Sequence, residues 1–181
     1  MNITVIGRGN VGGGLAKRWR GAGHDVQELG RDGGDASNAD VVLLAVPFGE
    51  IESALGKVEG VQGKVVVDAT NYFGGERPAF PSLAHLVKSI TGGPVAKSFN
   101  LNFAVLYDRI EEQAERPGNL YCADDEAREL TEQLIRDAGY EPVNAGNLDG
   151  ARALEDMLVV LMGISRAGGG QQGFYRFWQP S

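Results

Sequence analysis

Short apolar runs alternate with helical patterns along most of this chain. The run at residues 41–46, Val-Val-Leu-Leu-Ala-Val, is typical of a parallel strand buried on both faces. The predicted strands cover residues 2–6, 25–29, 41–46, 65–69, 94–99, 119–123 and 141–144. The predicted helices cover residues 10–20, 50–57, 82–90, 103–114, 124–138 and 149–165. This alternation predicts an α/β, Rossmann-like, doubly wound fold, with a mostly parallel sheet and helices on both faces.

Two stretches depart from the regular alternation. Residues 32–40 are rich in Gly, Asp, Ser and Asn and are too short for a helix plus a strand, so the second crossover is predicted to be shortened. The helix at 149–165 is apolar nearly all round from residue 157 to 162, which predicts a buried helix. Pro142 predicts that the last strand lies at an edge of the sheet.

The chain length of 181 residues predicts one domain, residues 1–165, followed by a tail at 166–181. The tail contains Gly168, Gly169 and Gly170 and then an aromatic cluster at 174–178. We expect these aromatic side chains to pack on the domain or on a partner in a homodimer. Stacking against a flat ring is the alternative.

Composition and charge narrow the possible partners. The formal net charge of -7 argues against nucleic acid. Apolar residues make up 43% of the chain, but no apolar run reaches the length of a membrane span. One cysteine, Cys122, excludes an intrachain disulfide and fits a reducing compartment. The chain enters a strand at residue 2 without a signal peptide, so a cytoplasmic location is expected.

A glycine pattern follows the first predicted strand. Gly7, Gly9 and Gly12 form Gly-x-Gly-x-x-Gly between a strand and a helix, which is the context of the dinucleotide-binding fingerprint. The first glycine permits a sharp turn, the second allows close approach of a pyrophosphate, and the third allows helix–strand packing. The helix N-terminus then directs free N–H groups at the phosphates. A plain βα turn with incidental glycines is the structural alternative.

The tip of the second predicted strand selects between NAD and NADP in such folds. Here it reads Gly30-Arg31-Asp32. Glu28 lies too early to bind a ribose, whereas the planar guanidinium of Arg31 suits a phosphate. This favours NADP, although Arg31 could also be an ordinary solvated residue.

The sequence lacks other catalytic patterns. His24 and His85 are the only histidines, and no cysteine or histidine cluster has the spacing of a metal site. No Ser/His/Asp arrangement is evident. We therefore predict no catalytic side chain and no metal, with the redox chemistry supplied by the dinucleotide.

Several segments together resemble the coenzyme F420-dependent NADP oxidoreductase family. The resemblance extends over essentially the whole chain, in the family's order. Its segments are 6–12 (Ile-Gly-Arg-Gly-Asn-Val-Gly), 30–31 (Gly-Arg), 45–47 (Ala-Val-Pro), 68–71 (Asp-Ala-Thr-Asn), 95–100 (Val-Ala-Lys-Ser-Phe-Asn), 123–127 (Ala-Asp-Asp-Glu-Ala), 145–148 (Ala-Gly-Asn-Leu) and 151–155 (Ala-Arg-Ala-Leu-Glu).

The resemblance implies an NADP site and hydride transfer between NADPH and a deazaflavin (F420) or a flavin-like small acceptor, without an essential acid or base. It places the pyrophosphate at Arg8, Gly9, Asn10 and Val11, and the 2′-phosphate at Gly30 and Arg31. Ala45, Val46 and Pro47 would line the adenosine side. Asn71, Ala96, Phe99 and Asn100 would lie near the nicotinamide. The family resemblance also implies a homodimer.

Two other functions are compatible with the same residues. The chain could be an NADP(H)-binding module without turnover, such as a nucleotide sensor or scaffold. It could also act on a hydroxy acid or an imine, but such enzymes usually append a sizeable substrate domain. The loop at 72–81 shows no clear match to a deazaflavin pocket.

Overall fold

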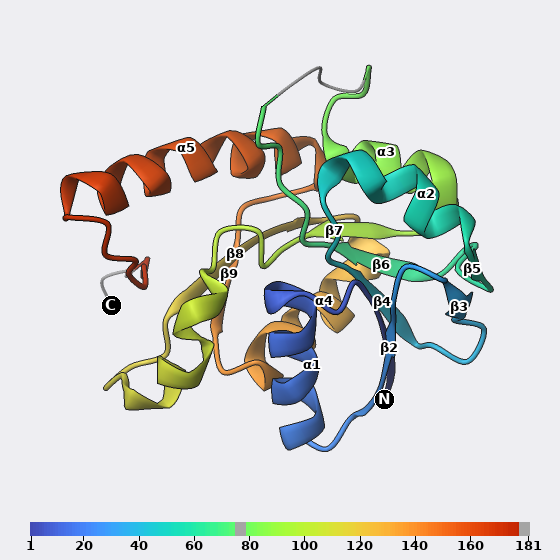
Figure 1. The fold of residues 1–181 in the computed structure, drawn as a ribbon, viewed down its shortest axis with the longest axis horizontal. Coiled ribbons are helices and arrows are strands. Elements are labelled where there is room, and N and C mark those ends of the chain that lie inside the picture. The colour runs from blue at the N-terminus through green and yellow to red at the C-terminus, as the bar shows by residue number, and fades with distance from the viewer. Residues whose placement is uncertain (75–78, 178–181) are drawn as a thin grey trace.

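A seven-stranded sheet forms the centre of the computed structural model, which describes residues 1–74 and 79–177 (Figure 1). Its order is β2-β1-β4-β6-β7-β8-β9, and only β7 and β8 pair antiparallel. The predicted doubly wound, mostly parallel α/β fold is confirmed. The strands are β1 (Asn2–Ile6), β2 (Asp25–Leu29), β4 (Val41–Leu44), β6 (Val65–Asp68), β7 (Val95–Lys97), β8 (Gly118–Ala123) and β9 (Glu141–Asn144).

Helices cover both faces of this sheet (Figure 1). On one face lie α1 (Asn10–Gly21) and α4 (Asp125–Asp137), and on the other lie α2 (Ile51–Gly56) and α3 (Leu83–Thr91). Each face has its own apolar core. All four residues of β4 are buried, as expected for a strand with apolar side chains on both faces.

The shortened second crossover contains a small sheet that the sequence did not predict. β3 (Gly34–Asp35) pairs parallel with β5 (Val58–Glu59). The two glycines at this turn, Gly33 and Gly34, have φ of +80° and +151°, and a Cβ on Gly33 would overlap the carbonyl of Lys57. The backbone of this turn therefore approaches the backbone of Lys57 closely, which requires glycine at position 33. The segment forms a short pair of strands instead of a helix.

The segment predicted as a helix at 103–114 is instead the 3₁₀ helix η2 (Ala104–Glu112). Its buried side chains include Tyr107 and Ile110, three residues apart, which matches the three-residue turn of a 3₁₀ helix. Short 3₁₀ segments also precede α2 and α5, at η1 (Phe48–Glu50) and η3 (Leu148–Gly150). Strand β9, which contains Pro142, lies at the sheet edge as predicted.

The prediction that the last helix is buried is wrong for one of its faces. Helix α5 (Ala151–Ala167) packs Leu154 and Leu158 against β8, but Val159, Val160 and Ile164 are 73%, 57% and 64% exposed. Figure 1 shows α5 extending past the sheet with its outer side uncovered. Only one face of this helix has a neighbour in the part of the chain that the structure describes.

The tail returns to the domain after α5. Tyr175 accepts a hydrogen bond from the backbone N–H of Leu120 (3.2 Å) through its hydroxyl, which also donates to Asn102 Oδ1 (3.1 Å). The N–H of Gly118 donates to the Tyr175 carbonyl at 2.8 Å. Phe174 packs against the main core, whereas Trp178, part of the predicted aromatic cluster, lies outside the described residues.

Candidate functional site

The turn between β1 and α1 depends on two of its glycines. Gly7 has φ of +107°, and a Cβ there would overlap the carbonyl oxygen of Ala45. A Cβ on Gly12 would overlap the carbonyl oxygen of Gly7 and would lie 3.0 Å from the side chain of Val5. The first and third fingerprint glycines therefore allow α1 to pack closely against the sheet.

The N-terminus of α1 is open to a ligand. Its N-cap is Gly9, which provides no side-chain cap, and its first turn contains no acidic residue. A Cβ on Gly9 would have no neighbour within 4 Å among the described residues. The first N–H groups of this helix, at Asn10, Val11 and Gly12, have no partner within an α-helix, so this end can bind an anion.

A cleft of about 910 Å³ opens in front of this turn. It brings together eight residues predicted to bind the cofactor: Gly7, Arg8, Gly9, Gly30, Arg31, Ala45, Val46 and Pro47. The cleft is also lined by residues that were not predicted to bind the cofactor: Ile6, Asp32, Glu50, Ser53, Ala54 and Lys57. Of the predicted pyrophosphate residues, Asn10 and Val11 lie in the first turn of α1, with the fingerprint glycine Gly12, and are not among the residues that line the cleft.

Three cations line this cleft. A Cβ on Gly30 would overlap the guanidinium of Arg8, so the glycine leaves room for that side chain at the tip of β2. Lys57 donates a hydrogen bond from Nζ to the carbonyl of Arg31 at 3.2 Å. Because Lys57 follows α2, sequence spacing alone gave no sign that it reaches the Arg31 loop.

The predicted nicotinamide side contains an asparagine pair at the carboxyl ends of β6 and β7. Asn71 donates from Nδ2 to the carbonyl of Asn100 at 2.6 Å, and Asn100 donates from Nδ2 to Asn71 Oδ1 at 3.1 Å. Asn100 also donates to the carbonyl of Leu154 at the start of α5, at 3.1 Å. These contacts join two strand ends to α5.

Ala96 and Phe99 lie in the protein core. Ala96 is fully buried within β7, and Phe99 packs edge-to-face against Trp19 with the ring centroids 5.7 Å apart. Phe99 has φ of +60°, the one positive φ among described non-glycine residues. Their contribution to a cofactor site remains a prediction.

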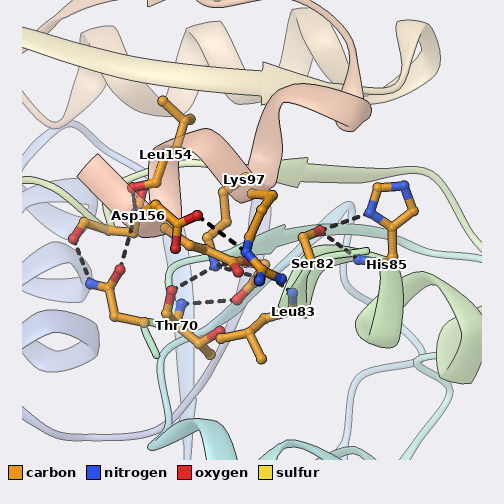
Figure 2. Close-up of polar contacts among 12 residues, drawn as sticks. Thr70, Ser82, Leu83, His85, Lys97, Leu154 and Asp156 are labelled. Atoms are coloured by element: carbon orange, nitrogen blue, oxygen red, sulfur yellow. Dashed lines mark hydrogen bonds and ion pairs between the residues drawn. The ribbon is translucent and has the colours of Figure 1, made fainter. Parts of the chain in front are cut away.

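A fully buried lysine, Lys97, lies at the end of β7 and contacts Thr70, the residue before Asn71 (Figure 2). Lys97 Nζ lies 2.9 Å from Asp68 Oδ2 and 3.2 Å from Glu155 Oε1, and it donates to the carbonyl of Thr70 at 2.6 Å. The N–H of Leu83, at the start of α3, donates to Glu155 Oε1 at 2.8 Å. This cluster, Lys97–Asp68–Glu155, fixes α3 and α5 against the strand ends. The sequence feature that could indicate this cluster is a lysine inside the predicted strand at 94–99.

Figure 2 also shows Ser82 beside His85, a pair that superficially resembles part of a catalytic triad. Ser82 Oγ lies 2.7 Å from His85 Nδ1, and Asp149 Oδ1 lies 3.7 Å from His85 Nε2. However, Ser82 is buried and accepts the N–H of His85 as the cap of α3. Its hydroxyl therefore stabilises a helix start rather than facing a substrate.

The described residues contain no cluster of three or more His, Cys, Asp or Glu side chains that could hold a metal ion. Within the same residues, no helix is both long and apolar enough to cross a membrane.

The sheet order and the glycine turn define a Rossmann-like α/β protein. Residues 27–72 match the model of a family described as NADP oxidoreductase, coenzyme F420-dependent. The resemblance noted from the sequence is confirmed over this segment, which contains Arg31 and Asn71. No curated protein matches the chain.

Solved structures share the fold over most of the chain. A candidate F420-dependent NADP reductase from Arthrobacter sp. FB24 is 21% identical, with a TM-score of 0.83, covering 98% of this chain and 99% of that one. A hypothetical protein from Sinorhizobium meliloti is 25% identical, with a TM-score of 0.68 and coverages of 82% and 86%. A reductive aminase from Aspergillus terreus, in complex with NADPH and ethyl-5-oxohexanoate, is 15% identical, with a TM-score of 0.67 and coverages of 93% and 62%.

Proposed function

We propose that this protein is an NADPH-dependent oxidoreductase that passes hydride to a deazaflavin (F420) or a flavin-like small acceptor. The observation that carries the proposal is the cleft lined by Gly9, the N-cap of α1, together with three cations, Arg8, Arg31 and Lys57. A dinucleotide with an additional phosphate needs both features.

The cleft residues fit NADP in the following way. The N–H groups at the start of α1 would bind the pyrophosphate, where Gly9 leaves open space. Arg31 and Arg8 would bind the 2′-phosphate, with Lys57 adding positive charge and holding the Arg31 loop. Ala45, Val46 and Pro47 would contact the adenosine side. When bound, the nicotinamide supplies the hydride, so the protein mainly binds and orients.

The similar proteins support an NADP-dependent oxidoreductase, without establishing its acceptor. The matching family is described as NADP oxidoreductase, and one neighbour of similar fold was solved with NADPH. The F420 acceptor is supported by the family's description and by the description of the Arthrobacter structure of similar fold. Imine-type acceptors are less favoured, because this chain covers only 62% of the reductive aminase.

Binding of the dinucleotide is tested by Arg31→Ala. NADPH affinity should fall ten- to a hundred-fold, roughly 1.5–3 kcal/mol for a charge-assisted contact, while NADH affinity stays nearly unchanged. Isothermal titration calorimetry measures both. Arg109→Ala is the matched control, because Arg109 lies on η2 in a surface pair with Glu112. Equal losses for NADPH and NADH would show that Arg31 does not bind the 2′-phosphate.

Turnover is tested separately by following NADPH absorbance with F420 or FMN as acceptor. Acceptor-dependent loss of NADPH supports the reductase proposal. Tight NADPH binding without consumption by any tested acceptor, with a working positive-control enzyme, would instead support a nucleotide-binding module.

A further inference from the structure

A lysine outside the glycine fingerprint lies beside the Arg31 loop. Lys57 directly follows α2, and its exposed side chain lines the cleft together with Arg8 and Arg31. Its ammonium donates a hydrogen bond to the carbonyl of Arg31 at 3.2 Å. An ammonium has three N–H donors, so this group can bind a ligand in the cleft without releasing that carbonyl.

Backbone contacts fix where Lys57 lies. The N–H of Gly34 donates to the Lys57 carbonyl at 3.2 Å, and Gly34 pairs with Val58 in the small sheet of β3 and β5. Gly33 has φ of +80°, and a Cβ there would overlap the same carbonyl. The shortened crossover therefore holds the end of α2 against the tip of β2 through contacts that need no ligand.

One face of α2 and its flanking residues forms a wall of the cleft. The lining residues of this wall are three or four positions apart, which places them on one side of a helix: Glu50, Ser53, Ala54 and Lys57. Glu50 and Lys57 are separated by about 10 Å along a helix axis. The carboxylate and the ammonium are therefore at opposite ends of the wall, and Lys57 is at the end next to Arg31.

The charge balance of the cleft depends on Lys57. Three cations line the cleft, but two carboxylates, those of Asp32 and Glu50, line it as well. Without Lys57 this lining would have no net formal charge, in a chain whose formal net charge is -7. A phosphate monoester carries a charge of about -1.5 to -2 at pH 7. Binding such a group in this cleft therefore requires the positive excess that Lys57 supplies.

We propose that Lys57 determines the selectivity for NADP over NAD, through direct contact between its ammonium and the 2′-phosphate. This inference rests on the proposed NADP site, and it assigns phosphate recognition to a residue that belongs neither to the glycine fingerprint nor to the tip of β2. NAD has a neutral ribose hydroxyl at the same place, which gains little from an added cation. Lys57 should therefore affect the binding of NADP and not that of NAD.

Two ligands that differ by one phosphate test the contact. Adenosine 2′,5′-bisphosphate carries the 2′-phosphate and AMP lacks it, and neither contains a nicotinamide. Isothermal titration calorimetry on the full chain gives the ratio of their dissociation constants, and NADPH with NADH gives the same ratio for the complete dinucleotides. The wild type should prefer the phosphorylated member of each pair. Lys57→Met should weaken binding of that member about ten-fold, as for a charge-assisted contact, and leave the other nearly unchanged.

A double-mutant cycle separates direct contact from support of the Arg31 loop. If Lys57 acted only by holding Arg31 in place, Lys57→Met would have no effect once Arg31 is alanine. Direct contact with the phosphate predicts that adding Lys57→Met to Arg31→Ala weakens NADPH binding by a further factor of about five or more. Lys57→Arg keeps the positive charge and should retain most of the selectivity.

Lys64→Met is the matched control. Lys64 also donates to carbonyls of the second crossover, those of Ser37 and Ala39, at 2.7 Å and 2.8 Å, but it does not line the cleft. Its replacement should leave the selectivity at the wild-type value. Thermal unfolding confirms that each variant is folded.

The outcomes distinguish this inference from the function on which it rests. Wild-type selectivity in Lys57→Met overturns the inference and leaves the NADP site intact. A double variant that binds NADPH like Arg31→Ala alone also overturns it, because Lys57 would then act only through the loop. Equal loss of selectivity in Lys64→Met would assign the effect to the crossover as a whole and would likewise overturn it. A wild type without any preference within the ligand pairs would overturn the proposed NADP site, and this inference with it.

Discussion

Replacing Lys97 by methionine should strongly destabilise the fold. Lys97 is fully buried, and its ammonium is the cation that lies between the carboxylates of Asp68 and Glu155. Methionine has a similar length but no charge, so both carboxylates would remain buried without their positive partner. Removing one partner from a buried ion pair typically costs about 3–5 kcal/mol.

This loss is large enough to measure by thermal or urea unfolding followed by circular dichroism. For a chain of this length, each kcal/mol corresponds to roughly 2–4 °C, so the melting temperature should fall by about 6–20 °C. Glu155→Gln should cost less, about 1–2 kcal/mol, because the glutamine oxygen can still accept the N–H of Leu83 while Lys97 keeps Asp68.

Lys17→Met is the matched control, because Lys17 pairs with Asp108 while both side chains are largely exposed. It should leave the unfolding midpoint unchanged within error. The reasoning fails if Lys97→Met is as stable as Lys17→Met, or if Glu155→Gln is more damaging than Lys97→Met. Either result would mean that the buried lysine does not compensate the two carboxylates.

Two further predictions concern β8 and its neighbours. Tyr175→Phe should lower the free energy of unfolding by about 1–3 kcal/mol in urea titrations, because the Leu120 N–H and Asn102 lose their hydroxyl partner; an unchanged midpoint would contradict a stabilising tail. Burial raises the pKa of the Cys122 thiol from 9.0 to about 11 and also shields its sulfur, so at pH 8 its reaction with a disulfide reagent should be slower by at least about a hundred-fold in the folded than in the urea-unfolded chain. Because the folded state favours the protonated thiol, this contribution to stability is present below about pH 9 and is lost as the pH rises towards 11, which alkaline unfolding curves of wild type and Cys122→Ala would compare.

The features that were predictable from sequence depend on local pattern. An uninterrupted apolar run predicts β4 because a parallel strand is enclosed on both faces. The turn at Gly7 was predictable because one backbone conformation and one close approach both require glycine. Pro142 predicted an edge strand because proline cannot donate a ladder hydrogen bond.

The features that were not predictable depend on pairing between distant segments. Lys57 reaches the Arg31 loop, and Glu155 reaches Lys97, only because the fold brings these elements together. No local period encodes either contact. A lysine within the predicted strand at 94–99 is a local sign that a buried partner is needed, but it does not identify Asp68 and Glu155 as the partners.

The incorrect prediction for α5 follows from what periodicity measures. A helix that is apolar all round indicates that all its faces are to be covered, but the pattern does not say whether the same chain covers them. Here Leu154 and Leu158 pack on β8, while Val160 and Ile164 do not contact a core. The same pattern is consistent with a core helix and with a helix that completes its burial through a second copy.

Helix α5 therefore has a buried, fixed first part and an exposed second part, although its sequence pattern is continuous. Its first two turns are fixed at the strand ends by Glu155, and by the Leu154 carbonyl, which accepts a hydrogen bond from Asn100. The exposed side chains of Val159, Val160 and Ile164 lie further along the same helix. Because only the first turns are held by buried polar contacts, the Lys97–Asp68–Glu155 cluster sets the position of the whole helix at the strand ends. The buried charges of this cluster therefore have a structural role in positioning α5, separate from any contact with a cofactor.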